Sequence, residues 1–246
     1  YRDIEMAYLS YYQKYPESPL NASIFYDLLF KSVYQRDTLN ARKYLDLLIQ
    51  NFPLSQKCRD ALELYFTSSI SNLEDTTFLN LAANKNRAIA SDLNFYKGNL
   101  YLKSKLLDQA LNIFNSINEG RYKDEAKLKI LEIYSMTGKY QEVEIIGQDA
   151  LPDELSTPTH LKILELFLQS LKMQGKSDAF ESFTQYYISK NTPYTKDIAL
   201  FVANMYLKES DTVSAIKYLM LAKSFGATTE EILKYNPDLL KLSRRL

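Results

Sequence analysis

The sequence predicts an all-α fold, a right-handed α-solenoid of about six helix pairs with a C-terminal capping helix. A pattern of small, aromatic, small and large residues occurs twice, 105 residues apart. Its two copies are Gly98, Tyr101, Ala110 and Phe114, then Ala203, Tyr206, Ala215 and Leu219. The 246 residues include only six glycines and seven prolines, which argues against all-β folds because those need many tight turns. A repeated helix-turn-helix unit explains both observations.

The first copy shows how one unit is built. Apolar residues at helical spacing predict one helix over residues 87–104 and a second over 107–117. The turn between them is short, so the two helices must run antiparallel. Gly98 and Ala110 then lie where the two backbones approach each other, and Tyr101 and Phe114 fill the space beside that contact.

Later units repeat this arrangement. Tyr134, Leu171 and Tyr206 take the place of Tyr101, at intervals of 33, 37 and 35 residues, and we call these four residues the anchors. Each anchor is followed by a short turn. Gly138 and Gly175 stand in two of these turns, where a left-handed backbone is expected and glycine has no β-carbon to oppose it.

The first 86 residues carry a different marker. Pro16 and Pro53, 37 residues apart, each follow an aromatic residue at the end of a predicted helix. Proline ends the preceding helix, and the serine after it can cap the next one. The helices predicted here cover 3–14, 19–34, 38–51, 55–72 and 75–84. The first would be the second helix of a unit whose first helix is absent, and the last two form the weakest unit.

The last 20 residues depart from the repeat. Thr229 is expected to cap a helix, and Pro237 to break or restart it. Stacked repeats need a terminal cap with a polar outer face. We therefore predict one superhelical domain over 1–246, with degenerate units in 1–86, clearer units in 87–226 and a cap in 227–246.

These motifs resemble the tetratricopeptide repeat, a helix-turn-helix unit of 34 residues with small and aromatic residues at these spacings. The Tyr-Pro-x-Ser pattern of the front half is more specifically similar to bacterial envelope lipoproteins, such as the β-barrel-assembly lipoprotein and the cell-division coordinator. The resemblance implies a scaffold that binds other proteins. Cys58 cannot be the lipidated cysteine of such proteins, because it falls within a predicted helix.

Composition excludes several classes of partner. Lys and Arg balance Asp and Glu, and no basic stripe occurs, which argues against nucleic-acid binding. No apolar run reaches the roughly 18–20 residues of a membrane-spanning helix. A single cysteine allows no internal disulfide. The sequence leaves open a signal peptide or lipid anchor ahead of Tyr1.

Residues that carry out chemistry are sparse. His160 is the only histidine, and we interpret it as a surface or packing residue. Lys57 and Arg59 flank Cys58 and could lower its pKa, but neighbours on a helix point in different directions, so we favour a buried cysteine. No phosphate-binding loop or dinucleotide motif is present. We expect neither an enzyme nor a cofactor or metal ion.

The binding surface should be the concave face, which is formed by the first helix of each unit. Two positions per unit point into it, two residues before and two after each anchor. We call these eight residues the groove positions: Asn99, Lys103, Glu132, Met136, Gln169, Met173, Asn204 and Lys208. Phe95 and Leu102 lie on the neighbouring track. Asn and Gln can bond an extended peptide, Met adapts to apolar groups, and Lys meets carboxylates.

Some proteins that this chain resembles hold a C-terminal carboxylate with a clamp of Lys, Asn and Arg. Asn99, Lys129 and Lys162 match parts of it, but Phe95 and Leu166 replace its first Lys and its last Arg. That departure argues against a chaperone-tail function.

We therefore expect a non-enzymatic scaffold in a heteromeric complex, located in a bacterial envelope or periplasm. The alternative is a cytosolic adaptor or co-chaperone-like regulator. A hydrolase or transferase with a repeat-based accessory region is a third hypothesis, and it would need a cluster of His, Asp, Glu and Ser that the sequence does not show.

Overall fold

The computed structural model describes residues 2–243, with side chains for residues 5–242, and the described residues form helices without strands. The helices are α1 (Arg2–Lys14), α2 (Leu20–Tyr34), α3 (Thr38–Asn51), α4 (Gln56–Thr67), α5 (Asp75–Lys85), η1 (Arg87–Ile89), α6 (Ala90–Lys103), α7 (Leu107–Asn115), α8 (Lys123–Met136), α9 (Tyr140–Ala150), α10 (Pro158–Met173), α11 (Ser177–Ser189), α12 (Thr195–Lys208), α13 (Thr212–Ser224), α14 (Thr229–Tyr235) and α15 (Pro237–Ser243). The all-α class predicted from the sequence is confirmed.

The chain divides into two compact units, residues 1–126 and residues 127–246, and the division falls within α8. We call them unit 1 and unit 2. The boundaries at 86/87 and 226/227 separate parts of the chain by how regular their repeats are, and they do not coincide with the division between the two compact units. The single domain over 1–246 stays a prediction.

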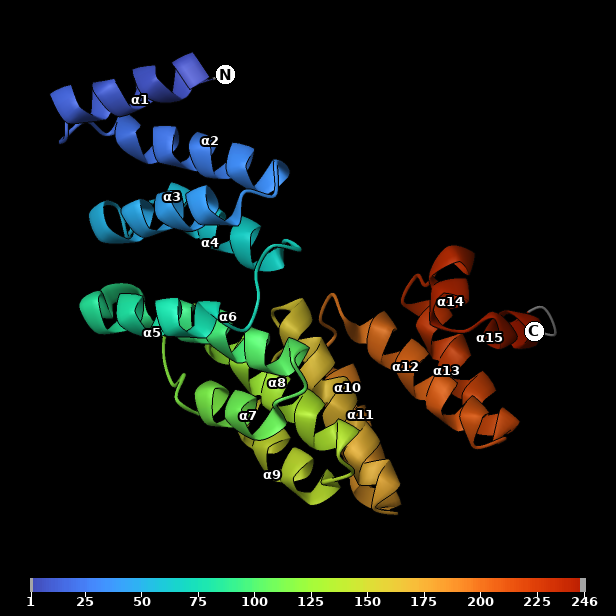
Figure 1. Ribbon diagram of the computed structural model, residues 1–246. Coiled ribbons are helices and arrows are strands. Elements are labelled where there is room, and N and C mark those ends of the chain that lie inside the picture. Colours follow the sequence, from blue (N-terminus) through green and yellow to red (C-terminus); the bar gives the residue numbers. More distant parts are fainter. Residues whose placement is uncertain (1, 244–246) are drawn as a thin grey trace. The chain divides into compact units, whose positions relative to one another are not determined.

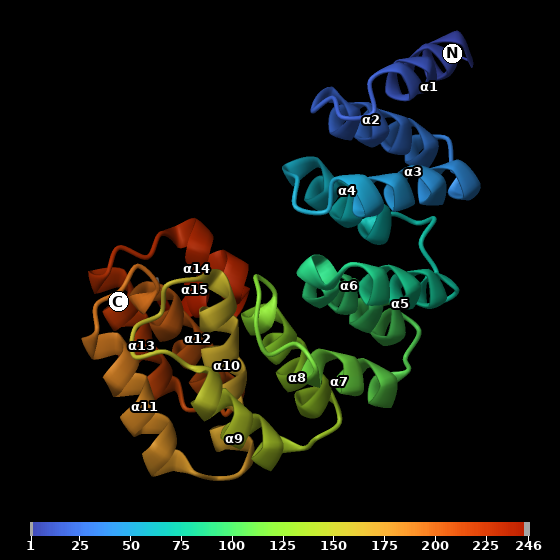
Figure 2. The same ribbon diagram turned by 90° about the vertical axis from the view of Figure 1, so that its left-hand side faces the viewer.

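Unit 1 is a stack of neighbouring helices (Figures 1 and 2). Helix α2 packs against α3 and α4, and α6 packs against α5 and α7. Helix α1 lies beside α2 at the end of the stack. One continuous core runs through α2 to α6, and its largest fully buried side chains include Phe25, Tyr44 and Tyr65.

Unit 2 has the same construction. Helix α9 packs against α10, and α12 packs against α13 more extensively than any other helix pair described here. The cap helices α14 and α15 contact α12. The core of this unit includes the fully buried Phe167, Phe180 and Tyr218, and Ile232 and Leu239 of the cap extend it.

Five helix pairs are joined by turns of one kind. Each turn has one residue in the left-handed region: Arg36, Lys105, Gly138, Gly175 or Ser210, with φ between 57° and 72°. The expectation for Gly138 and Gly175 is confirmed. Three turns use other residues, although a β-carbon opposes this backbone conformation.

A hydrogen bond closes each of these turns on the anchor. The amide of the residue after the left-handed one donates to the carbonyl oxygen of Tyr101, Tyr134, Leu171 or Tyr206, over 2.9 to 3.0 Å. This is the helix-ending pattern in which the sixth residue bonds back to the first. Asp37 makes the same bond to Ser32 over 2.8 Å, so Ser32 is a fifth anchor. The repeat is therefore defined by a shared turn as well as by packing.

The weakest predicted unit contains an irregular connection. A helix was expected over 55–72, but α4 ends at Thr67, and Ser68 has extended backbone angles. The segment 68–74 leads to Asp75, whose carboxylate is fully buried. Asp75 accepts hydrogen bonds from the Tyr65 hydroxyl, over 3.1 Å, and from the Asn72 amide, over 2.9 Å, and it pairs with Arg42. These bonds hold α3, α4 and α5 together where the repeat is irregular.

Two other helix boundaries differ from the prediction. The helix expected over 87–104 begins as the short η1, and α6 starts at Ala90, because the backbone of Ile89 is not helical. Thr229 was expected to cap the last segment, but Thr228 does so. Its hydroxyl accepts from the Glu231 amide over 3.2 Å while the Glu231 carboxylate accepts from the Thr228 amide over 2.9 Å. Pro237 starts α15, as expected.

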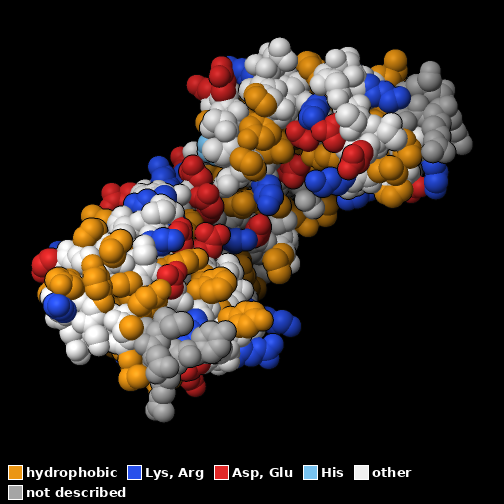
Figure 3. All heavy atoms as spheres, turned by 90° about the horizontal axis from the view of Figure 1, so that it is seen from above, with side chains coloured by type: hydrophobic (Ala, Val, Ile, Leu, Met, Phe, Trp, Pro, Cys, Tyr) orange, Lys and Arg blue, Asp and Glu red, His pale blue; other side chains and the backbone are white. Residues whose placement is uncertain are grey.

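Charged side chains of both signs are interspersed with apolar ones over the face shown in Figure 3. Within the described part of the chain, no helix combines the length and apolar character needed to cross a membrane.

Candidate binding surface

Two groove positions of α6 open onto a pocket of about 490 Å³ in unit 1, which we call the aromatic pocket. Asn99 and Lys103 line it, as does Phe95 from the neighbouring track. The other lining residues come from α4, from α6 and from the segment before α8: Glu63, Phe66, Thr67, Tyr96, Leu100, Arg121 and Tyr122. The pocket therefore joins three parts of unit 1 that are separated in the sequence.

Stacked rings form the walls of the aromatic pocket. The ring centroids of Phe95 and Tyr122 are 4.2 Å apart and their planes differ by only 5°. Phe66 on α4 stacks on Tyr96 of α6 at 5.2 Å. Phe95, predicted on the neighbouring track, is only 9% exposed and packs into the pocket wall. The rings are rigid and present apolar surface.

The polar ends of these rings are already bonded to one another. The hydroxyl groups of Tyr96 and Tyr122 are 2.7 Å apart, and Arg121 donates to the Tyr122 oxygen. Burial, followed by the hydrogen bond to Tyr122, raises the pKa of Tyr96. Arg121 also lies 3.5 Å from the Asp92 carboxylate. The Tyr96 hydroxyl therefore stays protonated near neutral pH.

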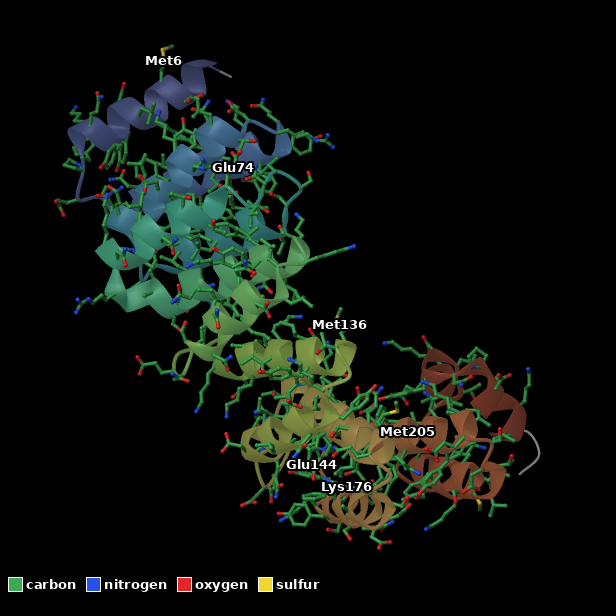
Figure 4. The ribbon with its side chains drawn as sticks, turned by 60° about the horizontal axis from the view of Figure 1, so that its bottom comes forward. Met6, Glu74, Met136, Glu144, Lys176 and Met205 are labelled. Atoms are coloured by element: carbon green, nitrogen blue, oxygen red, sulfur yellow. The ribbon has the colours of Figure 1, made fainter. Side chains whose placement is uncertain are left out.

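A second pocket, of about 220 Å³, lies between α10 and α12 of unit 2, and we call it the methionine pocket. Four groove positions line it, namely Gln169, Met173, Asn204 and Lys208. The remaining lining residues are Lys172, Phe201, Met205 and Glu209. Figure 4 labels Met205, whose unbranched side chain can adapt to different apolar groups.

One cation of the methionine pocket is held in place. Lys172 donates to the Glu209 carboxylate over 2.9 Å and lies 4.1 Å from the centroid of the Tyr206 ring. Tyr206, the anchor of α12, in turn bonds to Glu181. Lys208 is exposed at the end of α12. Lys208 is thus the more accessible of the two lysines for a partner.

The cap reaches groove residues of unit 2. The Asn236 amide donates to the Asn204 side-chain oxygen over 2.8 Å, so one groove amide is bonded to the chain's own C-terminal segment. The Tyr235 hydroxyl lies 3.5 Å from a carboxylate oxygen of Glu165 on α10, and Lys196 of α12 pairs with Glu231. The cap therefore contacts first helices as well as the end of the stack.

Burial shapes the ionisation of the acids beneath the cap. It raises the pKa of Glu165, against the lowering effect of the Tyr235 hydrogen bond, and it raises the pKa of Asp197. The hydrogen bond from Lys196 lowers the pKa of Glu231 to about 2. Burial therefore favours the protonated forms of Glu165 and Asp197, whereas the ion pair with Lys196 favours the charged form of Glu231 in the cap.

The remaining predicted positions do not line either pocket. Lys129 and Glu132 form an ion pair with each other over 2.8 Å on α8. Met136 is 74% exposed at the C-terminal end of α8, where Figure 4 shows it, and Leu102 is half-buried. Lys162 is exposed on α10. Asn99 belongs to unit 1 and both clamp lysines to unit 2, so the clamp stays a prediction.

The sequence interpretation missed several surface residues. Phe66, Arg121 and Tyr122 lie outside the anchor spacing, and no pattern marks them as neighbours of α6. Phe30 and Tyr34 stand two residues before and after Ser32, and they are 53% and 85% exposed. The signal for this second group was the Arg36–Asp37 turn, but Ser32 is not aromatic and was not recognised as an anchor.

Other kinds of site have little support in the part of the chain that the structure describes. No group of three or more His, Cys, Asp or Glu side chains is placed to bind a metal ion. His160 is half-buried at the start of α10, where its amide donates to Thr157 and its ring lies 3.3 Å from the Ser156 hydroxyl. Cys58 is fully buried, as expected.

No family model and no curated protein matches the chain. Among solved structures, the chain is similar to a tetratricopeptide repeat protein from Parabacteroides merdae. The two are 20% identical, the match covers 98% of this chain and 91% of that one, and the TM-score is 0.48. The helix-pair fold itself follows from the contacts and turns of this chain.

Proposed function

We propose that this chain is a non-enzymatic scaffold that binds another protein through its groove positions. One observation carries the proposal: six of the eight groove positions line two surface pockets, one in each unit. Asn99 and Lys103 are in the aromatic pocket, and the other four are in the methionine pocket. Helix repetition alone does not require that these side chains surround hollows.

The chemistry of these positions suits a polypeptide partner. Side-chain amides at Asn99 and Gln169 can bond an extended backbone, and Met173 offers adaptable apolar contact. Helices already form both surfaces, so binding orders little of the scaffold. A partner held in its folded conformation is stabilised by mass action, which is the effect that we propose for this complex.

We further propose that the complex forms in a bacterial envelope, with a lipid anchor or signal peptide encoded ahead of Tyr1. The support is the Tyr-Pro-x-Ser pattern around Pro16, which is similar to envelope lipoproteins. The alternative is a cytosolic adaptor. Fractionation of cells that produce the natural gene product distinguishes them, because an envelope protein appears in the membrane or periplasmic fraction and an adaptor in the cytosol.

Two double variants with equal charge changes test the binding surface. Lys103→Glu with Lys208→Glu reverses one groove charge in each unit. Lys105→Glu with Lys217→Glu reverses one charge in each unit outside both pockets, at residues that are also exposed. Tagged proteins are used to capture partners from the producing cells. We expect one stoichiometric partner with the wild type and with the second variant, and a large loss with the first. Equal capture by both variants would count against the groove positions.

A further inference from the structure

The aromatic pocket has a more specific chemistry than the rest of the surface. Its aromatic lining is one cluster: the stacked pairs Phe95–Tyr122 and Phe66–Tyr96 also meet edge to face, with the ring centroids of Tyr96 and Tyr122 5.7 Å apart. Because the Tyr96 and Tyr122 hydroxyls bond to each other, the rings offer the guest mainly apolar surface. A hollow of about 490 Å³ lies within the range of ligand pockets, which is about 300–1,000 Å³. A flat apolar group, such as an aromatic side chain, fits both the size and the lining.

The charged side chains at the rim of the pocket favour a particular kind of residue next to the aromatic group of the guest. Arg121 is already paired with Asp92. Lys103 is exposed and makes one long hydrogen bond, 3.5 Å, to the carbonyl oxygen of Ser71. Its ammonium group therefore keeps donors for a guest. Asn99, one helical turn earlier on α6, adds an amide to the same rim.

A second helix of the pocket carries a negative charge. Glu63 is exposed on α4 and lines the pocket. A guest carboxylate is repelled there and attracted at Lys103, so the charges orient the guest. With an aromatic group against this lining, its acidic neighbour at Lys103 would lie toward the C-terminal end of α6.

We infer that the aromatic pocket binds a segment of the partner protein in which an aromatic side chain stands beside a carboxylate, with the ring against the aromatic lining and the carboxylate at Lys103. The inference rests on the proposed scaffold function and names the chemistry of one of its contacts. Ring stacking supplies affinity, and the lysine supplies direction.

Three synthetic peptides test the inference with the complete chain. The first is Gly-Ser-Glu-Phe-Glu-Ser-Gly, the second replaces Phe by Ala, and the third replaces both Glu by Lys. Titration is followed by the amide NMR signals of the ¹⁵N-labelled protein. We expect the first peptide to shift the signals of Phe66, Asn99 and Lys103, and the Ala peptide to bind about tenfold or more weakly, because the ring is lost from an apolar site.

Charge reversal gives a second readout. Lys103→Glu should weaken the Glu-flanked peptide about fivefold and strengthen the Lys-flanked one. Lys105→Glu, two residues away and outside the pocket, is the matched control and should change neither affinity appreciably. Both variants replace exposed side chains, and their melting temperatures confirm that they fold.

Several results would overturn the inference. They are equal binding of the Phe and Ala peptides, stronger binding of the Lys-flanked peptide to the wild type, no binding of any peptide, or an equal effect of Lys103→Glu on both charged peptides. If partner capture remains sensitive to the groove variants while these peptides fail, the scaffold proposal stands and only the aromatic–acidic assignment falls.

Discussion

The ring of Phe114 on α7 lies against the backbone of Gly98 on α6, so closely that a β-carbon at residue 98 would stand 2.5 Å from the ring. Phe114 is only 1% exposed, so the core encloses its ring. The small residue in the repeat therefore has a direct steric role.

Gly98→Ala should destabilise the protein by about 1–2 kcal/mol. Overpacking a core costs about 1–3 kcal/mol, and the better helix propensity of Ala returns about 0.5–1 kcal/mol. Urea unfolding of the wild type and the variant measures the difference. In a Phe114→Ala background the same change should be neutral or stabilising, because the clash is gone and the propensity gain remains. Equal losses in both backgrounds would contradict the steric account.

The left-handed turns predict opposite effects at two positions of unit 2. A β-carbon at Gly175 would meet nothing within 4 Å, so Gly175→Ala tests the backbone alone and should cost about 1 kcal/mol. Ser210 has φ 64°, and Ser210→Gly should stabilise by about 0.5 kcal/mol. Thermal melts of the two variants measure both. Shifts in the same direction would show that φ does not determine stability at these turns.

Cys58 should be unreactive in the folded protein. It is fully buried, and burial raises the pKa of its thiol to about 12, although Arg59 acts to lower it. Only the thiolate is nucleophilic, so at pH 8 we expect the native protein to react with an aromatic disulfide reagent at least about a hundredfold more slowly than the unfolded protein. Native and urea-unfolded samples provide the comparison. Rapid stoichiometric labelling of the native sample would contradict the burial of Cys58.

Glu165 should make the stability of unit 2 depend on pH. Burial raises the pKa of Glu165 in the folded state above its usual value of 4.5. The folded state therefore binds a proton more readily than the unfolded state, and this carboxyl adds stability as pH falls from neutral through its folded pKa toward 4.5. Glu165→Gln removes the cost of burying the charge, and Gln can still accept from Tyr235. The variant should be more stable than the wild type at pH 7, and the difference should shrink toward pH 4.5.

Denaturant unfolding at several pH values checks this expectation. Glu142→Gln makes the same change at an exposed residue of α9 and serves as the control. A gap between wild type and Glu165→Gln that widens as pH falls would have the wrong sign for a raised carboxyl pKa.

The fold was predictable because its determinants are local. Helical spacing gave 38–51 and 75–84 nearly as α3 and α5 have them, and the Tyr101 spacing located turns that the structure closes on the anchors. Gly138 and Gly175 were identified because only a left-handed backbone favours glycine there. These signals lie within a few residues of the elements that they determine.

Irregular elements and the binding surface depend on distant contacts, and the sequence interpretation was weaker there. The irregular connection after α4 leads to the buried Asp75, whose hydrogen bond from Tyr65 no periodicity shows. The groove positions followed from helix geometry, but the aromatic pocket also needs Phe66 and Tyr122 from neighbouring elements. The anchor role of Ser32 was not predictable from side-chain patterns, because its backbone carbonyl oxygen makes the hydrogen bond that closes the turn.

Photo-crosslinking in the producing cells tests the central claim most directly. A benzophenone amino acid replaces Lys103 or Lys208 at the groove positions and, as controls, Lys105 or Lys217 at exposed residues outside the two pockets. The account predicts that irradiation joins the same protein partner to positions 103 and 208 and leaves 105 and 217 without it. Crosslinks to that partner from 105 and 217 alone would place the binding surface elsewhere and contradict the account.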